Sequence, residues 1–508
     1  MRSNVVIPDE LRLHGMHIVS GKGTGKSRFM GRLLSFRDVQ LGIPTVVIDP
    51  EGLTIDNLLD RINLLPPEEQ LTIWPRMRYI NMAGYNGRVM PFPLYYRLGD
   101  ESLAIIANRY IETLGRIDPN LELAPIQGKN AIEHIGTYAG IVLAGLGYQI
   151  TEAESLLTNP GEWEGRLHHL KDMYKDAIVD QTVQFWKHRY VKSEAMMFRN
   201  KMGRILLDPV SRAIYGASQQ GVSWHEMVEK RLCVLVDLSA EIPDYMREMN
   251  MRWVLHSLLT FAISTGKTGR PPVSIIIDEL PDIYRLHDEL FAKELNRIIH
   301  QKARNNNIWL TVAHQEMTQF DEATRDVLMT MGIQILGRTD NPKTAREYAE
   351  RYHPYDKDWL HDSNPIMTPL SYNGESYPIQ VGEHRMFFNP DEQERLEMPK
   401  FMRRPPLHFY IELANSKRLR PAWLPGEDVR RDLNIAFIKR AKDLLIRKFG
   451  ISITQVEQEI RARLNENVLP VYAGTLEYEV PAGYAIQRQG GDDEDPVFKA
   501  ARTGTGKK

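Results

Sequence analysis

The sequence is poor in cysteine: Cys233 is the only one among 508 residues. A single cysteine excludes an internal disulfide and is typical of proteins that stay in a reducing cytoplasm. Cys233 lies within the apolar run RLCVLVDLS, so we expect it to be a small buried side chain of a strand.

An excess of charge of either sign is also missing. The chain has 64 Lys and Arg against 66 Asp and Glu, which gives a formal net charge of -2. The overall charge therefore gives no indication of nucleic-acid binding. Any contact with a phosphate backbone has to come from local basic patches.

Long hydrophobic runs are scarce. The N-terminus MRSNVVIPDELRLHG lacks the apolar core of a signal peptide. The only candidate for a membrane span is IGTYAGIVLAGLGYQIT, residues 135–151, which is uncharged and contains a G-x-x-x-G pattern. It barely reaches the roughly 17–25 residues that cross a bilayer, so we interpret it as a buried helix. We expect no integral membrane segment and a cytoplasmic location, which includes the periphery of a membrane apparatus.

Along the chain, strand-like segments alternate with helical segments. Apolar runs of strand length occupy residues 16–19, 44–52, 77–84, 231–239, 272–280, 308–315 and 332–338. Helical periodicity between them indicates a parallel sheet covered by helices. From about residue 100 to 215 only the helical pattern remains. We therefore predict an α/β fold with a mainly parallel sheet, interrupted by an all-α insertion domain.

The rest of the chain is predicted as follows. Residues 354–406 are rich in Pro, Asn and Asp, and we expect a long irregular segment there. The run PLHFYIEL, residues 406–413, is predicted to close the sheet edge. A basic helical stretch covers 429–450, and the tail from Arg488 is expected to be disordered. The predicted domains are residues 1–98 and 217–425 for the two core parts, 99–216 for the insertion and 426–508 for the extension and tail.

A glycine-rich turn follows the first strand-like run. Its residues are Ser20, Gly21, Lys22, Gly23, Thr24, Gly25, Lys26 and Ser27, and helical sequence comes after them. Except at Ser20, this is the Walker A pattern, in which backbone N–H groups surround phosphates at the start of a helix. We predict that residues 21–27 bind a nucleotide, that Lys26 reaches the β- and γ-phosphates and that Ser27 binds Mg²⁺. The alternatives are a surface turn rich in Gly and Lys, or a loop that has lost its nucleotide.

Two adjacent acids end a later strand-like run, VSIIIDEL. We predict that Asp278 holds the metal's outer shell and that Glu279 polarises the attacking water. A Glu at this position argues against a loop that only binds, because binding alone needs no base.

Three further polar residues follow strand-like runs or turns. Gln315 ends IWLTVAHQ and suits a sensor of the γ-phosphate. Arg304 in QKARNNN and Arg338 in GRTDNP lie at turns, where an arginine can face a neighbouring subunit's phosphate. The alternative for each arginine is a surface ion pair.

Two basic stretches are candidates for DNA contacts. Residues 185–204 contain Lys187, Arg189, Lys192, Arg199, Lys201 and Arg204 against one Glu. They suit either a phosphate backbone or a solvated helix face. The basic stretch 429–449 has the same two interpretations, and its apolar residues Ile435, Phe437, Leu444 and Leu445 offer a third, packing on a partner.

The order of these motifs resembles the FtsK–HerA superfamily of ring-forming DNA-pumping ATPases, and in particular the coupling proteins of type IV secretion and conjugation. The motifs are SGKGTGKS, VVIDPEG, a helical insertion, RLCVLVDLS, SIIIDEL, KARNNNIWLTVAHQ and ILGRTDNPKTA, within roughly residues 12–420. The resemblance implies a RecA-like core and a hexamer around DNA. Typical coupling proteins carry transmembrane helices before Walker A, whereas only 19 residues precede Ser20, so we expect that anchor to be missing.

The resemblance also implies roles for the candidate residues. Lys26 and Ser27 would bind ATP and Mg²⁺, Asp278 and Glu279 would form Walker B, and Gln315 would be the sensor. Arg304 matches the arginine finger, and Arg338 matches a second arginine near the nucleotide. The expected function is a homohexameric ATP-driven DNA translocase that delivers DNA to a transfer or secretion apparatus. The alternatives are a HerA-like motor partnered with a nuclease, and an ATP-gated recruitment scaffold with little turnover.

Overall fold

The computed structural model describes most of the chain outside its two ends. The described residues are 6–95, 101–117, 126–189, 192–219, 221–239, 242–264, 270–282, 296–297, 302–372, 374–414, 416, 419–424 and 430–465. The predicted disordered tail lies outside them, as does most of the helical pattern at 293–303.

Nine strands form one sheet. Their order is β12 (Arg420–Trp423), β11 (His408–Leu413), β8 (Ile333–Leu336), β1 (Met16–Val19), β7 (Ile308–His314), β6 (Val273–Ile277), β2 (Thr45–Asp49), β5 (Cys233–Asp237) and β3 (Met77–Asn81). The pairs β1–β8, β2–β5, β2–β6 and β3–β5 are parallel. All seven strand-like runs of the sequence belong to this sheet, which confirms the predicted α/β fold.

By its contacts the chain divides into two compact units. Unit 1 comprises Met1–Lys26, Tyr284–Asn296 and Val312–Pro425, and unit 2 comprises Ser27–Ile283, Arg297–Thr311 and Gly426–Lys508. The predicted domain boundaries are a different division, based on sequence pattern, and they remain a proposal.

In unit 2, the strands β2, β5 and β6 are apolar runs in which every residue is buried. Such runs are typical of parallel strands covered on both faces. The register pairs Asp49 with Asp237 and Ile48 with Ile277. The carboxyl ends of the three strands are therefore level, and Asp278 follows β6 at the same edge.

Helices complete unit 2 around these strands. They are α2 (Lys26–Phe29), which begins at the last residue of unit 1, the π-helix η1 (Met30–Ser35), α3 (Phe36–Gln40), α4 (Leu53–Asn63), α5 (Pro67–Ile73), η2 (Trp74–Arg76), α14 (Trp224–Glu229), α15 (Asp244–Ser264), η6 (Leu280–Asp282), α17 (Ala303–Asn305), α22 (Ile435–Phe449) and α23 (Ile453–Asn465). The short strands β4 (Arg88–Val89) and β13 (Ile451–Ser452) pair antiparallel. The core face of α4 carries Ile55, Leu58, Leu59 and Ile62, whose i, i+3, i+4, i+7 spacing buries one side of a helix.

The segment between β4 and β5 is helical in its described residues up to Gly216. Its elements are α6 (Leu103–Ile117), α8 (Ile126–Leu146), η3 (Ile150–Glu152), α9 (Ala153–Thr158), η4 (Pro160–Trp163), α10 (Glu164–Met173), α11 (Ala177–Gln184), η5 (Phe185–Arg189), α12 (Lys192–Leu206) and α13 (Pro209–Gly216). These helices lie where the sequence predicts the all-α insertion, and its status as a separate domain stays a prediction.

The glycine-rich pattern of α8 serves helix packing. A Cβ on Gly140 would lie 2.7 Å from the Cβ of Ala107 on α6, so only glycine lets the two helices approach this closely. Residues 138–146 of α8 are buried, which confirms a buried helix. Within the ranges that the structure describes, no helix combines the length and the apolar character that a bilayer crossing requires.

The basic stretch 429–449 turns out to be an integral part of unit 2. Phe437 of α22 lies against Trp74 with ring centroids 5.9 Å apart, and Leu445 is buried. On α23, Arg463 pairs with Glu152 at 2.8 Å. Of the apolar residues considered for a partner, Phe437 and Leu445 are therefore used inside the unit, and Ile435 is exposed.

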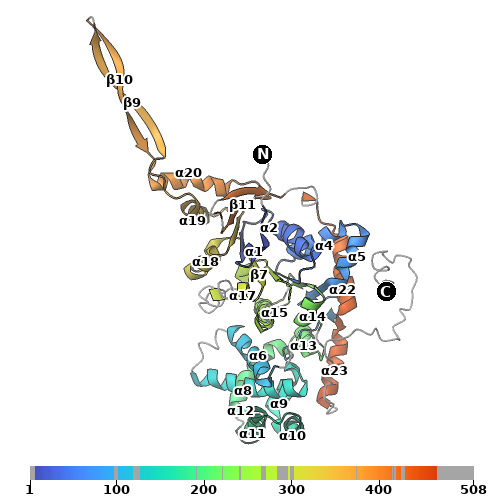
Figure 1. The fold of residues 1–508 in the computed structure, drawn as a ribbon. Coiled ribbons are helices and arrows are strands. Elements are labelled where there is room, and N and C mark those ends of the chain that lie inside the picture. Colours follow the sequence, from blue (N-terminus) through green and yellow to red (C-terminus); the bar gives the residue numbers. More distant parts are fainter. Residues whose placement is uncertain are drawn as a thin grey trace. The chain divides into compact units, whose positions relative to one another are not determined.

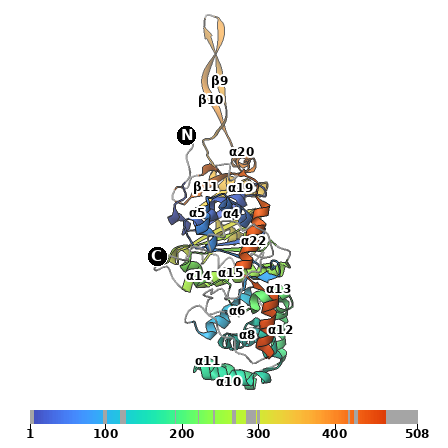
Figure 2. The ribbon, with the colours of Figure 1, turned by 90° about the vertical axis from the view of Figure 1, so that its right-hand side faces the viewer.

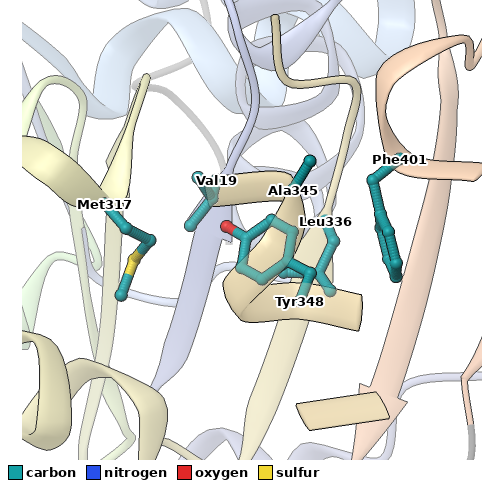
Figure 3. Packing of buried hydrophobic residues seen from close by; sticks show 6 residues of the cluster. All are labelled: Val19, Met317, Leu336, Ala345, Tyr348 and Phe401. Atoms are coloured by element: carbon teal, nitrogen blue, oxygen red, sulfur yellow. The ribbon is translucent and has the colours of Figure 1, made fainter. Parts of the chain in front are cut away.

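In unit 1, helices pack on the strands of the same unit. Its helices are α1 (Asp9–Arg12), η8 (Met317–Gln319), α18 (Glu322–Met329), α19 (Pro342–Tyr352) and α20 (Pro390–Met402). A buried cluster joins the strands and helices of this unit and contains Val19, Met317, Leu336, Ala345, Tyr348 and Phe401 (Figure 3). The cluster lies beneath the end of β1, where the glycine-rich turn begins.

Two expectations for unit 1 are wrong. The run 406–413 contains β11, but β11 lies between β8 and β12, so β12 is the edge strand. Residues 354–406 contain an antiparallel hairpin, β9 (Leu360–Tyr372) and β10 (Glu375–Phe387), followed by α20, instead of an irregular segment. The prolines of this segment misled the prediction. In a two-stranded ladder every second residue of each strand turns its N–H away from the partner, and a proline at such a position costs no ladder hydrogen bond.

Candidate nucleotide site

The glycine-rich turn runs from β1 into α2, as the sequence predicted. Gly23 and Gly25 have φ of 73° and 104°, conformations that glycine adopts without strain. The N–H of Gly21 donates to the carbonyl of Arg338 at 2.7 Å, and the N–H of Leu407 donates to the carbonyl of Thr24 at 2.7 Å. Two main-chain hydrogen bonds from other segments thus brace the turn.

The side chains of the turn separate into a buried and an exposed set. Thr24 and Lys26 are 2% and 9% exposed, whereas Lys22 and Gly23 are exposed. Burial of its side chain sets Lys26 apart from Lys22, the exposed lysine of the same turn.

Ser20, the departure from the Walker A pattern, is fully buried. The hydroxyl of Thr24 donates to the carbonyl of Gly21 at 2.6 Å, so Ser20 is the donor in its own hydrogen bond to the Thr24 hydroxyl. A Cβ on Gly337 would lie 2.6 Å from the Cβ of Ser20, so Gly337 supplies the space that serine needs. The serine is accommodated inside the turn and leaves the backbone N–H groups in place.

Ser27, the first residue of unit 2, has an acidic partner within the same unit. The hydroxyl of Ser27 donates to Asp278 Oδ2 at 3.1 Å, and the hydroxyl of Thr54 donates to the same oxygen at 2.7 Å. Asp278 is 2% exposed. The two residues that the sequence assigned to the metal are thus in direct contact.

Glu279, the predicted base, has an unusual backbone. Its φ is 61°, in the left-handed region that residues other than glycine rarely adopt. Such strain costs about 1–3 kcal/mol and is concentrated at functional sites. Glu279 is 6% exposed and stands directly after Asp278, at the level carboxyl edge of the strands.

Asp49 and Asp237 join Asp278 at this edge. Asp49 accepts the N–H groups of Gly52 at 2.8 Å and Ile55 at 2.9 Å, which fixes the start of α4. Burial, and then the charges of Asp278 and Asp237, raise the pKa of Asp49 to about 8. The raised pKa means that ionising Asp49 beside Asp278 and Asp237 is unfavourable at this edge.

Lys442 of α22 offsets part of this charge. Its Nζ lies 2.8 Å from Asp237 Oδ2 and 2.8 Å from Asp56 Oδ1. Tyr79 also donates to Asp237, at 2.7 Å. Burial opposes ionisation of Asp237, but the ammonium of Lys442 and hydrogen bonds from Ser239 outweigh it and lower the pKa of this carboxyl.

Some of these additional residues have a local signal in the sequence. Asp49 and Asp237 end apolar runs, as Asp278 follows one, and this shared ending was visible in VVIDPEG and VLVDLS. Thr54 and Lys442 had no local signal. Their role depends on contacts with residues more than 200 positions away.

In unit 1, Gln315 and Arg338 lie next to the turn's strand. Gln315 is half-buried directly after β7, where the carbonyl of His314 accepts the N–H of Ser20 at 3.2 Å. Arg338 is half-buried, holds Gly21 through its carbonyl, and its Nε lies 3.3 Å from Asp340 Oδ1. The ion pair considered for Arg338 is thus present, together with a main-chain contact to the turn.

Arg304 lies in the short helix α17 of unit 2 and is exposed. Among the residues that the structure describes, none forms an ion pair with it. Both interpretations of Arg304, an arginine finger and a surface ion pair, stay predictions.

A buried histidine pair connects the strands under the turn. The amide of Gln334 donates to the carbonyls of Leu328 at 2.9 Å and Met331 at 3.1 Å, so its Oε1 accepts from His17 Nδ1 at 2.6 Å. His17 Nε2 then accepts from His314 Nε2 at 2.7 Å. This order of donors requires His17 to be neutral, and burial lowers the pKa of His314 well below its usual value. Burial lowers the pKa of His17 to about 4, assisted by the charge of Arg351 and opposed by the Gln334 bond.

The basic patch at 185–204 is partly neutralised. Arg199 pairs with Glu154 at 2.7 Å, and Lys187 lies 3.5 Å from Glu164. Lys192 is exposed. The side chains of Arg189, Lys201 and Arg204 lie outside the described residues. The described pairs favour a solvated helix face, and a DNA contact here stays a prediction.

Comparison with known proteins gives structural neighbours only. No protein-family model and no curated protein matches the chain. The bacterial conjugative coupling protein TrwBdeltaN70, in a trigonal form with sulphate, aligns over 82% of this chain and 87% of its own, at 13% identity and a TM-score of 0.49. The plasmid coupling protein TrwB with ADP and Mg²⁺ aligns over 82% and 86%, at 15% identity and a TM-score of 0.45. VirB4 of Thermoanaerobacter pseudethanolicus aligns over 75% and 91%, at 13% identity and a TM-score of 0.39.

Proposed function

We propose that the chain hydrolyses ATP with the glycine-rich turn as its phosphate-binding element and with Asp278 and Glu279 as its acidic pair. The observation that carries the proposal is the 3.1 Å hydrogen bond from Ser27 to Asp278. It joins the last residue of the turn motif to a strand-end acid 251 positions away, and the next residue is a buried, strained glutamate. Phosphoryl transfer in P-loop enzymes needs these parts together.

The donor set fits Mg²⁺, which prefers hard oxygen ligands and keeps phosphates among them. Ser27 would hold the ion through its hydroxyl and Asp278 would orient that hydroxyl. The ion would supply charge neutralisation at the β- and γ-phosphates. Lys26 would contact the same phosphates, while the turn's N–H groups hold the nucleotide in place.

The remaining residues act on the attacking water and on the phosphate charge. Glu279 would orient and polarise the water, which is a task for a carboxylate held in one position. Gln315 would sense the γ-phosphate from the end of β7. Arg338 would position the turn through its carbonyl, with its guanidinium toward the nucleotide.

For the assembly and its task, the proposal is a homohexameric DNA translocase of the coupling-protein kind in the cytoplasm. The exposed Arg304 would complete the site of a neighbouring subunit as an arginine finger. DNA would be contacted through its backbone, and a transfer or secretion apparatus would receive it. The candidates for a base, a sensor and an arginine finger support a motor over a recruitment scaffold, and a HerA-like motor partnered with a nuclease is the alternative within the motor class.

The test is ATP turnover measured across protein concentration, with and without DNA. We expect DNA-stimulated turnover that rises with concentration. We expect it to be lost in Arg304→Ala and kept in the matched variant Arg461→Ala, an exposed arginine of α23. Mixing Arg304→Ala with Glu279→Gln should restore part of the activity, because each subunit lends the group that the other lacks.

Other outcomes would reject parts of the proposal. Turnover that is indifferent to concentration and to DNA would contradict a ring translocase but leave the ATPase standing. Tight ATP binding with no turnover under any condition would favour the recruitment scaffold.

A further inference from the structure

The β9–β10 hairpin is the largest feature of unit 1 that the proposed ATPase chemistry does not use. Each strand has 13 residues, and the ribbon projects from α20 away from the helices of its unit (Figures 1 and 2). None of the described residues from 360 to 387 is buried.

The register gives the hairpin two different faces, because opposite residues of an antiparallel pair point to the same side. One face, which we name the apolar face, carries the cross-strand pairs Leu360–Phe387, Asp362–Met386, Asn364–His384, Ile366–Gly382, Thr368–Ile379 and Leu370–Tyr377. The opposite face carries Ser363–Arg385, Pro365–Glu383, Met367–Gln380, Pro369–Pro378 and Ser371–Ser376. The register shifts between Gln380 and Gly382, where Val381 is unpaired, and again between Met386 and Phe387.

Large apolar side chains on the apolar face are open to solvent. Ile366, Leu370 and Tyr377 are 47%, 52% and 49% exposed. An isolated two-stranded hairpin is marginally stable in water, and contiguous exposed apolar surface marks an interaction site. A surface that covers this face would therefore stabilise the hairpin.

We propose that the apolar face packs against a second copy of this chain and extends the contact between neighbouring subunits. The inference rests on the proposed ring and names one structural element of its interface. The hairpin would then hold neighbouring subunits together, and we call this contact the hairpin contact.

Charge and backbone argue for a protein surface. The hairpin carries Asp362, Glu375 and Glu383 against Arg385, so it repels phosphate backbones and anionic lipid headgroups. Both of its edges present unpaired backbone N–H and C=O groups, which hydrocarbon does not satisfy.

Area argues for a copy of the same chain. Strands of this length span about 43 Å, and two strands are roughly 10 Å wide, so one face offers on the order of 400 Å². A specific complex buries about 800 Å² on each partner. The face is too small to hold an independent partner, but it suits an addition to an interface that two copies already share.

A complementary surface is available on the chain. Lys439 of α22 is exposed, and it offers positive charge to the acidic hairpin of another copy. Exposed Ile435 at the start of α22 adds an apolar contact point.

The experiment compares two double variants of the full chain by sedimentation velocity over a range of concentrations. Leu370→Ser with Tyr377→Ser removes one cross-strand pair of the apolar face. Met367→Ser with Gln380→Ser changes a pair on the opposite face and is the matched control. We expect the apolar-face variant to raise the concentration of half-assembly about tenfold or more, as loss of an interface anchor does. The control should assemble like the wild type, and thermal unfolding should show both variants folded.

A photo-crosslinking residue at Leu370, in a mixture of light and heavy chains, identifies the occupant. Light–heavy crosslinks support the inference. The inference is overturned if both variants assemble equally, or if the wild-type chain stays monomeric. It is also overturned if the wild type floats with lipid vesicles and the apolar-face variant does not, because the face would then bind a membrane. Because the readout is assembly, ATP turnover by a monomer would reject the ring translocase separately. If the apolar-face variant still assembles into a ring, only the hairpin contact is rejected.

Discussion

The glycine-rich turn and the acidic strand ends hold charge by opposite means. The turn offers backbone N–H groups and Lys26, and it is held by main-chain hydrogen bonds from Arg338 and Leu407. The strand ends gather carboxylates, which hydroxyls, backbone N–H groups and the ammonium of Lys442 keep in place. The turn is thus shaped by backbone conformation, and the acidic edge is shaped by side-chain partners. Substitutions at the acidic edge should therefore change turnover and stability by altering charge. Substitutions at the turn should change them by altering the steric room around the backbone.

The largest effect is expected at the edge, for Glu279→Gln. Loss of a base and water-orienting group lowers turnover by about 10²–10⁴-fold, while ATP binding stays, because the turn is untouched. Turnover and the dissociation constant of ATP check this, with exposed Glu322→Gln as the control. Normal turnover in Glu279→Gln would reject its assigned role.

Lys442→Met should cost stability. Removing one partner of a buried ion pair leaves Asp237 uncompensated, which reduces the free energy of unfolding by about 3–5 kcal/mol. Chemical denaturation checks this against Lys439→Met, an exposed position of the same helix. Adding Asp237→Asn to Lys442→Met should recover part of the loss. Equal stability of the two lysine variants would show that the edge does not depend on this ammonium.

The histidine pair under the turn predicts a dependence on pH. The pKa of His17 is lowered to about 4 in the fold, so its contribution to stability is complete above about 6.5. It is lost as the pH falls toward 4, because the unfolded chain binds the proton first. We expect a loss of up to about 3 kcal/mol across this window, from the difference between the two pKa values. In His17→Gln this part of the loss should vanish, whereas in the exposed His361→Gln it should persist. Parallel profiles for wild type and His17→Gln would contradict the assignment.

The smallest effect is expected from steric crowding between residue 337 and Ser20 of the turn. Gly337→Ala forces a Cβ against Ser20 and should cost about 1–3 kcal/mol, as overpacking does. Ser20→Gly removes the obstacle, so the double variant should recover most of the stability and the affinity for ATP. Thermal unfolding and nucleotide titration measure both. If Ser20→Gly fails to rescue Gly337→Ala, the steric account of this departure from the Walker A pattern is wrong.

The sequence predicted much of the site but not its partners. The glycine spacing before Lys26 and the acids after VSIII were readable, because each motif acts through its own few residues of backbone. Gly337, which makes room for Ser20, carried no local signal. The hairpin was missed because its prolines outweighed an alternation of apolar residues that only the pairing register makes visible.

The sequence by itself determined the parts whose physics is local. Buried apolar runs became parallel strands, helical spacing became helices, and glycines allowed the turn its left-handed conformations. The tertiary structure decided which charges meet. Lys442 reaches Asp237 across 205 positions, and Thr54 reaches Asp278 across 224. Such contacts depend on how strands and helices pack in three dimensions, and their free energy comes from burial and proximity, which the order of residues alone does not reveal.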